Sequence, residues 1–288
     1  MTPKPRAYSI RIFLPDGSPD GLRIVEKSNW TGAGLVFPRS LFPDAKSRAE
    51  FARTGVYVLI GPGPTGEVPT VYVGEGDPVR PRLEQHGKKD FWTSGVIFTS
   101  KDTSLNKAHV HYLEARLIEL ARDARRCELD NGNTPQRPSL SEADEAEAEA
   151  FLSEILLCFP VIGVSVFERP PEKARGADML LLQARGIRAT GYESPEGFVV
   201  TAGSQAALDE VESIHKYMSA MRAALVKNGV FKQDGKMFRV MQDYVFGSPS
   251  TASGVLLGRS SNGRVDWKTA EGRSLKDIQD EQLSAAKP

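Results

Sequence analysis

The sequence has little of several features that mark large protein classes. Its 288 residues include only two cysteines, Cys127 and Cys158, which stand far apart and in no metal-binding or redox spacing. This excludes a disulfide framework or a zinc knuckle. No apolar run approaches the roughly 18 residues of a transmembrane helix, and no secretory signal is visible. We therefore expect a cytoplasmic protein without a membrane partner.

The chain also lacks net charge, because 37 basic residues balance 37 acidic ones. Bulk attraction to a polyanion is therefore not indicated, but the charge is uneven. Residues 135–160 hold six acids and one arginine, whereas residues 215–276 hold eleven basic and four acidic residues. The C-terminal part is thus the best electrostatic candidate for phosphate contact, with a solvated face as the alternative.

Length and patterning favour about two domains of mixed α+β class. Alternating residues predict a strand at 8–14, and strand-like runs predict further strands at 56–60, 71–73, 96–99, 161–167, 179–184, 198–201 and 238–246. Helical signals predict helices at 78–86, 105–126 (capped by Asp102 or Ser104), 141–158 and 204–227, and another starting at Ser248-Pro249. We divide the chain into an N-terminal β-hairpin extension (1–50), a central α+β domain (51–134), an acidic helical linker (135–158) and a C-terminal α+β domain (159–288).

Residues 61–66 spell G-x-G-x-x-G directly after a predicted strand. A dinucleotide site would need a helix next, whose N-terminus meets the pyrophosphate. Here another strand follows instead. The glycines therefore predict a hairpin loop, and a small-molecule enzyme loses its main support.

This hairpin carries two tyrosines. If its loop is symmetric, Tyr57 lies opposite Tyr72, and cross-strand partners project to one face of the sheet. Valines flank both tyrosines and are out of phase with them, so they can cover a core on the other face. A tyrosine pair that merely seals the sheet is the structural alternative.

The predicted helix 105–126 carries an acid on its apolar side. At about 100° per residue, Glu114 falls within the arc of Leu113, Leu117 and Val110, whereas Tyr112 and Arg116 fall on the polar side. A carboxylate facing a core is costly unless it is paired or coordinated. Glu114 is therefore either a metal ligand or half of a buried ion pair.

Arg82 and His86 are spaced i, i+4 and share one face of the predicted helix 78–86. Arg82 could clamp a phosphate and His86 could carry a proton, with a solvated face as the alternative. His109 and His111 point to different sides of their helix, which argues against a metal shared between them.

These residues together resemble the GIY-YIG nuclease family. Gly55-Val56-Tyr57, Tyr72-Val73-Gly74, Arg82 to His86 and then Glu114 follow the family's order and spacing, with valine for isoleucine in both tripeptides. The resemblance covers residues 54–133 and implies a small mixed sheet with flanking helices. The family's asparagine after the glutamate helix matches Asn131 or Asn133, and we choose Asn131.

The resemblance implies roles for these residues. Glu114 would hold one Mg²⁺, with Mn²⁺ as an alternative, and Arg82 would stabilise charge on the scissile phosphate. Tyr57 would orient or deprotonate the attacking water, helped by Tyr72 or His86. Glu114 is the one acid placed on this face, which favours a one-metal over a two-metal mechanism.

The C-terminal part resembles an uncharacterised domain that is appended to GIY-YIG and restriction-modification proteins. Within it, Arg259, Arg264 and Lys268 supply positive charge and Trp267 could stack on a base, so we predict nucleic-acid contacts here. A capped core helix with ordinary surface cations is the alternative.

The sequence thus predicts a divalent-metal-dependent endonuclease that hydrolyses DNA, with RNA as an alternative substrate. A non-catalytic nucleic-acid-binding or adaptor protein on a nuclease scaffold is the second hypothesis, motivated by the neutral charge of the central domain.

Overall fold

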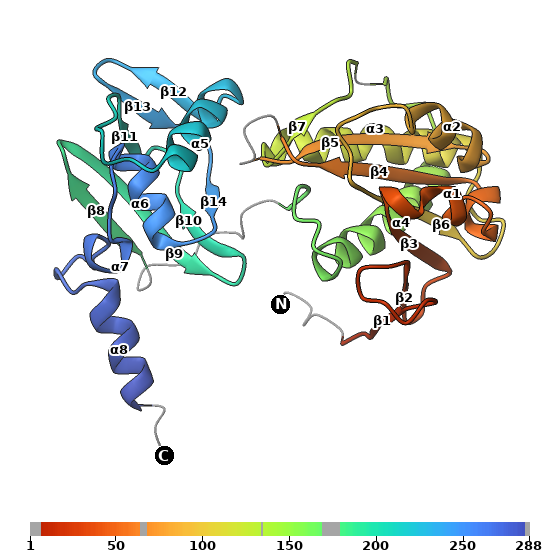
Figure 1. Ribbon diagram of the computed structural model, residues 1–288, viewed down its shortest axis with the longest axis horizontal. Helices are drawn as coiled ribbons and strands as arrows, with labels where there is room; N and C mark the ends of the chain where they lie inside the picture. The colour runs from red at the N-terminus through yellow and green to blue at the C-terminus, as the bar shows by residue number, and fades with distance from the viewer. Residues whose placement is uncertain (1–6, 64–67, 134, 169–178, 286–288) are drawn as a thin grey trace. The chain divides into compact units, whose positions relative to one another are not determined.

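The computed structural model describes residues 7–63, 68–133, 135–168 and 179–285 (Figure 1). They form two units, one with the described residues up to 168 and one with those from 179 onward. Each unit combines helices and sheets, which confirms the α+β class.

A seven-stranded sheet forms the centre of the first unit. Its order is β1-β2-β3-β6-β4-β5-β7, and all neighbours are antiparallel except β5 and β7. The strands are β1 (Ile10–Phe13), β2 (Arg23–Lys27), β3 (Gly32–Pro38), β4 (Gly55–Gly61), β5 (Thr70–Gly76), β6 (Ser94–Ser100) and β7 (Glu128–Leu129). The hairpins at the N-terminus and at β4–β5 are confirmed, and loop residues 64–67 lie outside the described residues. The segment 1–50 adds its strands to the same sheet as residues 51–134.

Helices cover both faces of this sheet, as strand alternation requires. On one face, valines of β4 and β5 form a core with α3 (Lys107–Ala124) and α4 (Glu142–Val161). On the other face, Tyr57 and Leu59 pack with α1 (Phe42–Ala45), α2 (Val79–His86) and the 3-10 turn Ala49–Ala52. Another 3-10 turn, Arg39–Leu41, precedes α1. The predicted separation of valines from tyrosines is confirmed.

Helix α3 begins later than predicted. Asn106, not Asp102 or Ser104, is the N-cap, because its side chain accepts a hydrogen bond from the backbone N–H of His109. Asp102 instead accepts bonds from the Ser100 hydroxyl and the Ser104 backbone. Which polar side chain caps the helix therefore depends on where the backbone enters the helix, and composition alone does not predict that position.

The acidic segment forms a helix, as predicted, with Ser141 as its N-cap. The apolar side of α4 packs on the valine face of the sheet through Phe151, Leu152 and Ile155. The strand predicted at 161–167 is wrong: α4 continues to Val161, and the apolar side chains that follow fill the same core from an irregular segment.

The supposedly polar side of α3 is covered by α4. The Tyr112 hydroxyl bonds to Glu145 and Glu149, and Arg116 donates to Glu149 at 2.5 Å. Burial raises the pKa of Glu149, but the bonds from Arg116 and Tyr112 outweigh it and leave the pKa lowered. Part of the acidic run therefore joins the two helices.

The second unit holds two smaller sheets, ordered β14-β10-β9-β8 and β11-β13-β12. Its strands are β8 (Leu180–Ala184), β9 (Ile187–Ser194), β10 (Gly197–Val200), β11 (Gln205–Ala207), β12 (Phe231–Asp234), β13 (Met237–Val240) and β14 (Tyr244–Phe246). Its helices are α5 (Lys216–Lys227), α6 (Pro249–Leu257), α7 (Gly263–Asp266) and α8 (Leu275–Ala285). Predicted strands at 179–184 and 198–201 and the Ser248 cap are confirmed.

Two predictions for this unit are wrong. The segment 204–227 begins with a strand and becomes helical only at Lys216, and the segment 238–246 divides into two strands in different sheets. In both places the apolar pattern continues across a turn, so one element was predicted where the structure has two. Across the described residues, no helix has both the length and the apolar character needed to cross a bilayer.

Candidate active site around strand β5

Tyr57 and Tyr72 share a face of the sheet but are not directly opposite. Tyr57 pairs with Gly74 and Leu59 with Tyr72, so the predicted register is wrong by two residues. A two-residue shift preserves the face, and the rings lie 6.3 Å apart between centroids. The last pair of the ladder is Gly61 with Thr70, so the centre of the hairpin lies one residue later in the chain than the predicted register assumed.

The motif glycines are explained by close packing. A Cβ on Gly74 would come within 2.3 Å of the Tyr57 hydroxyl, because the tyrosine ring crosses the strand at that point. A Cβ on Gly55 would come within 2.4 Å of the Phe98 carbonyl oxygen. Both glycines thus allow the Tyr57 ring and β6 to approach the sheet backbone.

His86, at the end of α2, joins the two phenols. Its Nδ1 lies 2.5 Å from the Tyr57 hydroxyl and its Nε2 lies 3.4 Å from the Tyr72 hydroxyl. In one tautomer Tyr57 donates to Nδ1. In the other, Nδ1–H donates to the Tyr57 oxygen and the Nε2 lone pair faces Tyr72. The three side chains form one hydrogen-bonded group.

Burial sets the acid–base character of this group. Tyr57 is fully buried, and desolvation followed by the neighbouring Tyr72 raises its pKa strongly. Desolvation, then Arg82 and Lys89, lower the pKa of His86, so its imidazole is neutral at pH 7. Tyr57 therefore keeps its proton and can act only through His86, whereas His86 and Tyr72 are partly exposed.

Arg82 lies on the same side of α2 as His86 and is exposed. Among the described residues it donates to Gln85 at 3.3 Å and forms no ion pair. Its charge acts on Tyr57, Tyr72, His86 and Glu114 in the direction expected of a nearby cation. The guanidinium remains available for an anionic ligand.

Glu114 on α3 is the acid of the site. Its side chain is only 9% exposed, and within the described residues it has no hydrogen bond or ion pair. Desolvation and then Glu75 raise its pKa to about 7, against a smaller opposing effect of Arg82. The buried ion pair considered as an alternative for Glu114 is therefore absent from the described residues.

These features fit a divalent cation. A desolvated carboxylate beside a second carboxylate is a costly arrangement that a cation would relieve. Glu114 would provide the buried oxygen ligand and Glu75, on β5, a nearby second acid, which is the donor chemistry that Mg²⁺ and Mn²⁺ prefer. Glu75 escaped the sequence analysis, although its phase with Val71 and Val73 places it on the α3 side of β5.

Asn131 holds β5 in place. Its side chain accepts from the Val73 backbone N–H at 3.0 Å and donates to the Val73 carbonyl at 2.8 Å, which ties the segment after β7 to β5 beyond their last paired residues. Asn133 is exposed. Of the two candidates, Asn131 is the one that contacts the site strand.

Lys89 is a further cation beside the site that the sequence analysis missed. Its ammonium lies 4.6 Å from the centre of the Tyr72 ring and 2.5 Å from Asp130. Because it comes after the end of α2, helical periodicity gave no signal for it. Lys89 contributes to the lowered pKa of His86.

Most of the residues of the second unit that were predicted to contact nucleic acid are buried or already paired with other side chains of the unit. Trp267 is fully buried, packs on Phe198 and donates to the Pro249 carbonyl, so the prediction that it stacks on a base is corrected. Arg264 pairs with Asp280 and Arg259 lies 3.8 Å from Asp266. Asp280 belongs to α8, just beyond the basic stretch 215–276, and so does Glu281, which pairs with Arg273.

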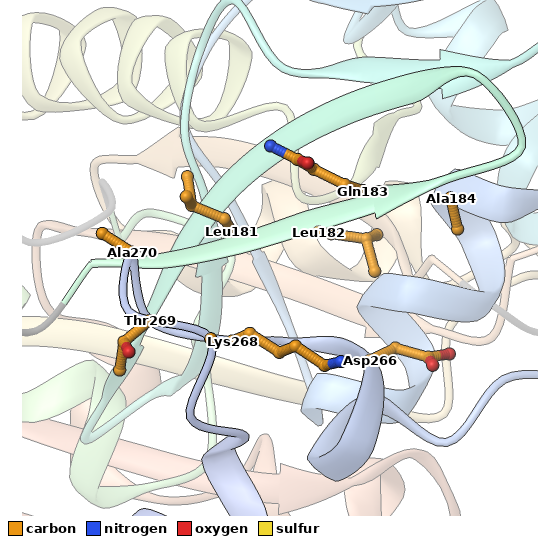
Figure 2. Close-up of a pocket in the computed structure, with 9 residues that line it drawn as sticks. Leu181, Leu182, Gln183, Ala184, Asp266, Lys268, Thr269 and Ala270 are labelled. Carbon is orange, nitrogen blue, oxygen red and sulfur yellow. The ribbon is translucent and has the colours of Figure 1, made fainter.

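Lys268 lines a pocket beside the edge strand β8. Figure 2 shows residues 268–270 next to this strand, and Lys268 exchanges two backbone hydrogen bonds with Leu181. The cavity measures about 320 Å³. Asp266 also lines it, so the pocket has no excess of positive charge.

Comparison with known proteins identifies one region. Residues 180–279 match a family model described as a domain of unknown function (DUF4357). The resemblance of the C-terminal part to an uncharacterised domain is confirmed to that extent. Neither a curated protein nor a solved structure matches the chain.

Proposed function

We propose that the first unit is a divalent-metal-dependent endonuclease that hydrolyses DNA phosphodiester bonds. The observation that carries this proposal is the group around β5: a neutral histidine bonded to two tyrosines, an exposed unpaired arginine and a buried unpaired glutamate. It combines a proton acceptor, a phosphate-binding cation and a cation ligand, which are the parts that phosphodiester hydrolysis needs.

In this proposal His86 accepts the proton. Water attacks phosphorus, its proton moves to Nε2 of His86 beside Tyr72, and the bond from phosphorus to the leaving oxygen breaks. Tyr57 accepts the Nδ1–H bond and orients the ring, since its raised pKa rules it out as the base. The leaving oxygen takes a proton from solvent.

Arg82 neutralises the charge that develops on the phosphate oxygens. Glu114, with Glu75 nearby, would hold one Mg²⁺ or Mn²⁺. When bound, this cation would polarise the phosphate and lower the pKa of a bound water. The DUF4357 region is proposed to contribute to the choice of nucleic acid.

Cleavage of supercoiled plasmid in Mg²⁺ tests the proposal. We expect Glu114→Gln and His86→Gln each to reduce cleavage by at least about 100-fold, and EDTA to abolish it. Glu84→Gln is the matched control, because Glu84 is an exposed acid that pairs with Lys46. Wild-type cleavage by Glu114→Gln would refute the proposal.

A second candidate is a non-catalytic nucleic-acid-binding protein. The complete burial of Tyr57 and the zero net charge favour it. It predicts that DNA or RNA binding persists in EDTA, that no substrate is cut and that Glu114→Gln leaves binding unchanged.

A further inference from the structure

A second group of side chains that could hold a metal ion lies at the N-terminal end of α3. One ligand atom each from His109, Asp144 and Glu147 can be chosen so that all three lie within 4.8 Å of one another. His109 comes from the first turn of α3, whereas Asp144 and Glu147 are spaced i, i+3 on α4 and share a face. The cluster uses none of the residues around β5.

The surroundings of His109 fix which nitrogen faces the acids. Its side chain is 4% exposed, and Nδ1 lies 3.1 Å from the carbonyl oxygen of Ser104. A carbonyl only accepts, so Nδ1 carries the hydrogen. In the neutral ring the Nε2 lone pair therefore points at Asp144. A ring N–H bonded to a backbone carbonyl is also the usual support of a metal-binding histidine.

The distance between Nε2 and Asp144 favours a metal over a direct ion pair. They are 3.4 Å apart, longer than the roughly 2.7–2.9 Å of a charge-assisted hydrogen bond. Two ligands about 2.0–2.1 Å from a tetrahedral Zn²⁺ lie about 3.4 Å apart. The other Asp144 oxygen accepts from the Ser141 hydroxyl at 2.6 Å, so Oδ1, the oxygen that faces Nε2, is the one placed to bind an ion.

Charge points the same way. A protonated His109 would balance only one of the two carboxylates, whereas a divalent ion with a neutral imidazole balances both. An imidazole with two carboxylates suits Zn²⁺ better than Mg²⁺ or Ca²⁺, which prefer oxygen ligands alone. We propose that His109, Asp144 and Glu147 bind Zn²⁺ and thereby join α3 to α4.

Equilibrium dialysis of the full chain against ZnCl₂, without nucleic acid, tests this site. We expect one high-affinity Zn²⁺ per wild-type chain and an affinity at least about tenfold lower in His109→Asn and Glu147→Gln. Since Glu147 is exposed, the second variant is informative even if the first fails to fold. His111→Asn is the matched histidine control and should bind like wild type, because His111 lies on the same helix but outside the cluster.

Two results would overturn the proposal. The first is that wild type binds no stoichiometric Zn²⁺ at micromolar free metal, and the second is that both His109→Asn and Glu147→Gln bind Zn²⁺ as tightly as wild type does. At the same zinc concentration, the melting temperature should also rise more for wild type than for Glu147→Gln. Because the assay involves no cleavage, its outcome is independent of the proposed nuclease activity.

Discussion

The first unit leaves charged side chains unpaired around β5, whereas the second unit pairs or buries three of the four residues predicted to contact nucleic acid, namely Arg259, Arg264 and Trp267. Glu114 and Arg82 have no ion-pair partner among the described residues. Arg264, Arg273 and Arg259 face acids, and Trp267 lies in the core. Charged side chains without a partner therefore mark the candidate site more clearly than a high density of basic residues does. Four measurements test this contrast.

The largest expected effect is structural and concerns the second unit. Trp267→Ala should destabilise it by about 3–5 kcal/mol, because it removes a fully buried ring and its hydrogen bond to Pro249. Denaturant unfolding followed by far-ultraviolet circular dichroism measures this, because Trp267 is the tryptophan of this unit and its removal leaves tryptophan fluorescence only in the first unit. Unchanged stability with loss of DNA binding would restore the base-stacking interpretation.

The two units should also differ in the response of their arginines. Arg82→Ala should lower plasmid cleavage by about 100-fold, whereas Arg264→Ala should change cleavage less than about twofold, since exposed ion pairs contribute little. Initial rates at matched Mg²⁺ give the comparison. Equal losses in both variants would place phosphate contacts in both units.

The ionised side chain of Glu114 should lower the folding stability of the protein, because it is buried without a partner among the described residues. Its pKa is raised to about 7 in the folded state, so folding stability falls as pH rises from about 4.5 to about 7 and the unfolded chain ionises first. We expect Glu114→Gln to be more stable by about 1–3 kcal/mol at pH 8 and little changed at pH 4. Chemical denaturation at both pH values measures the difference. If Glu114→Gln were less stable than wild type at pH 8, the conclusion that the Glu114 carboxylate has no partner would be contradicted.

The smallest effect is on cation affinity. Because protonated Glu114 cannot bind a cation well, the Mg²⁺ concentration for half-maximal cleavage should fall about fivefold between pH 6 and pH 7 and about twofold between pH 7 and pH 8. Titrations of cleavage against Mg²⁺ at the three pH values show this. A constant midpoint would remove Glu114 from the cation site.

Much of the fold around the candidate site could be predicted because its signals are local. The alternation of valine and tyrosine predicted a hairpin with two different faces. Helical periodicity placed Glu114 toward the core, and the i, i+4 spacing placed Arg82 and His86 together. Each pattern depends only on the geometry of one element.

The tertiary structure decided which partners those faces meet. It set the hairpin register, buried Tyr57 behind His86, brought Glu75 to Glu114 and covered Tyr112 with α4. It also placed acids of α8 against the arginines of the basic stretch. Periodicity within one element fixes the direction of a side chain, but burial, pairing and pKa depend on the other elements that pack there.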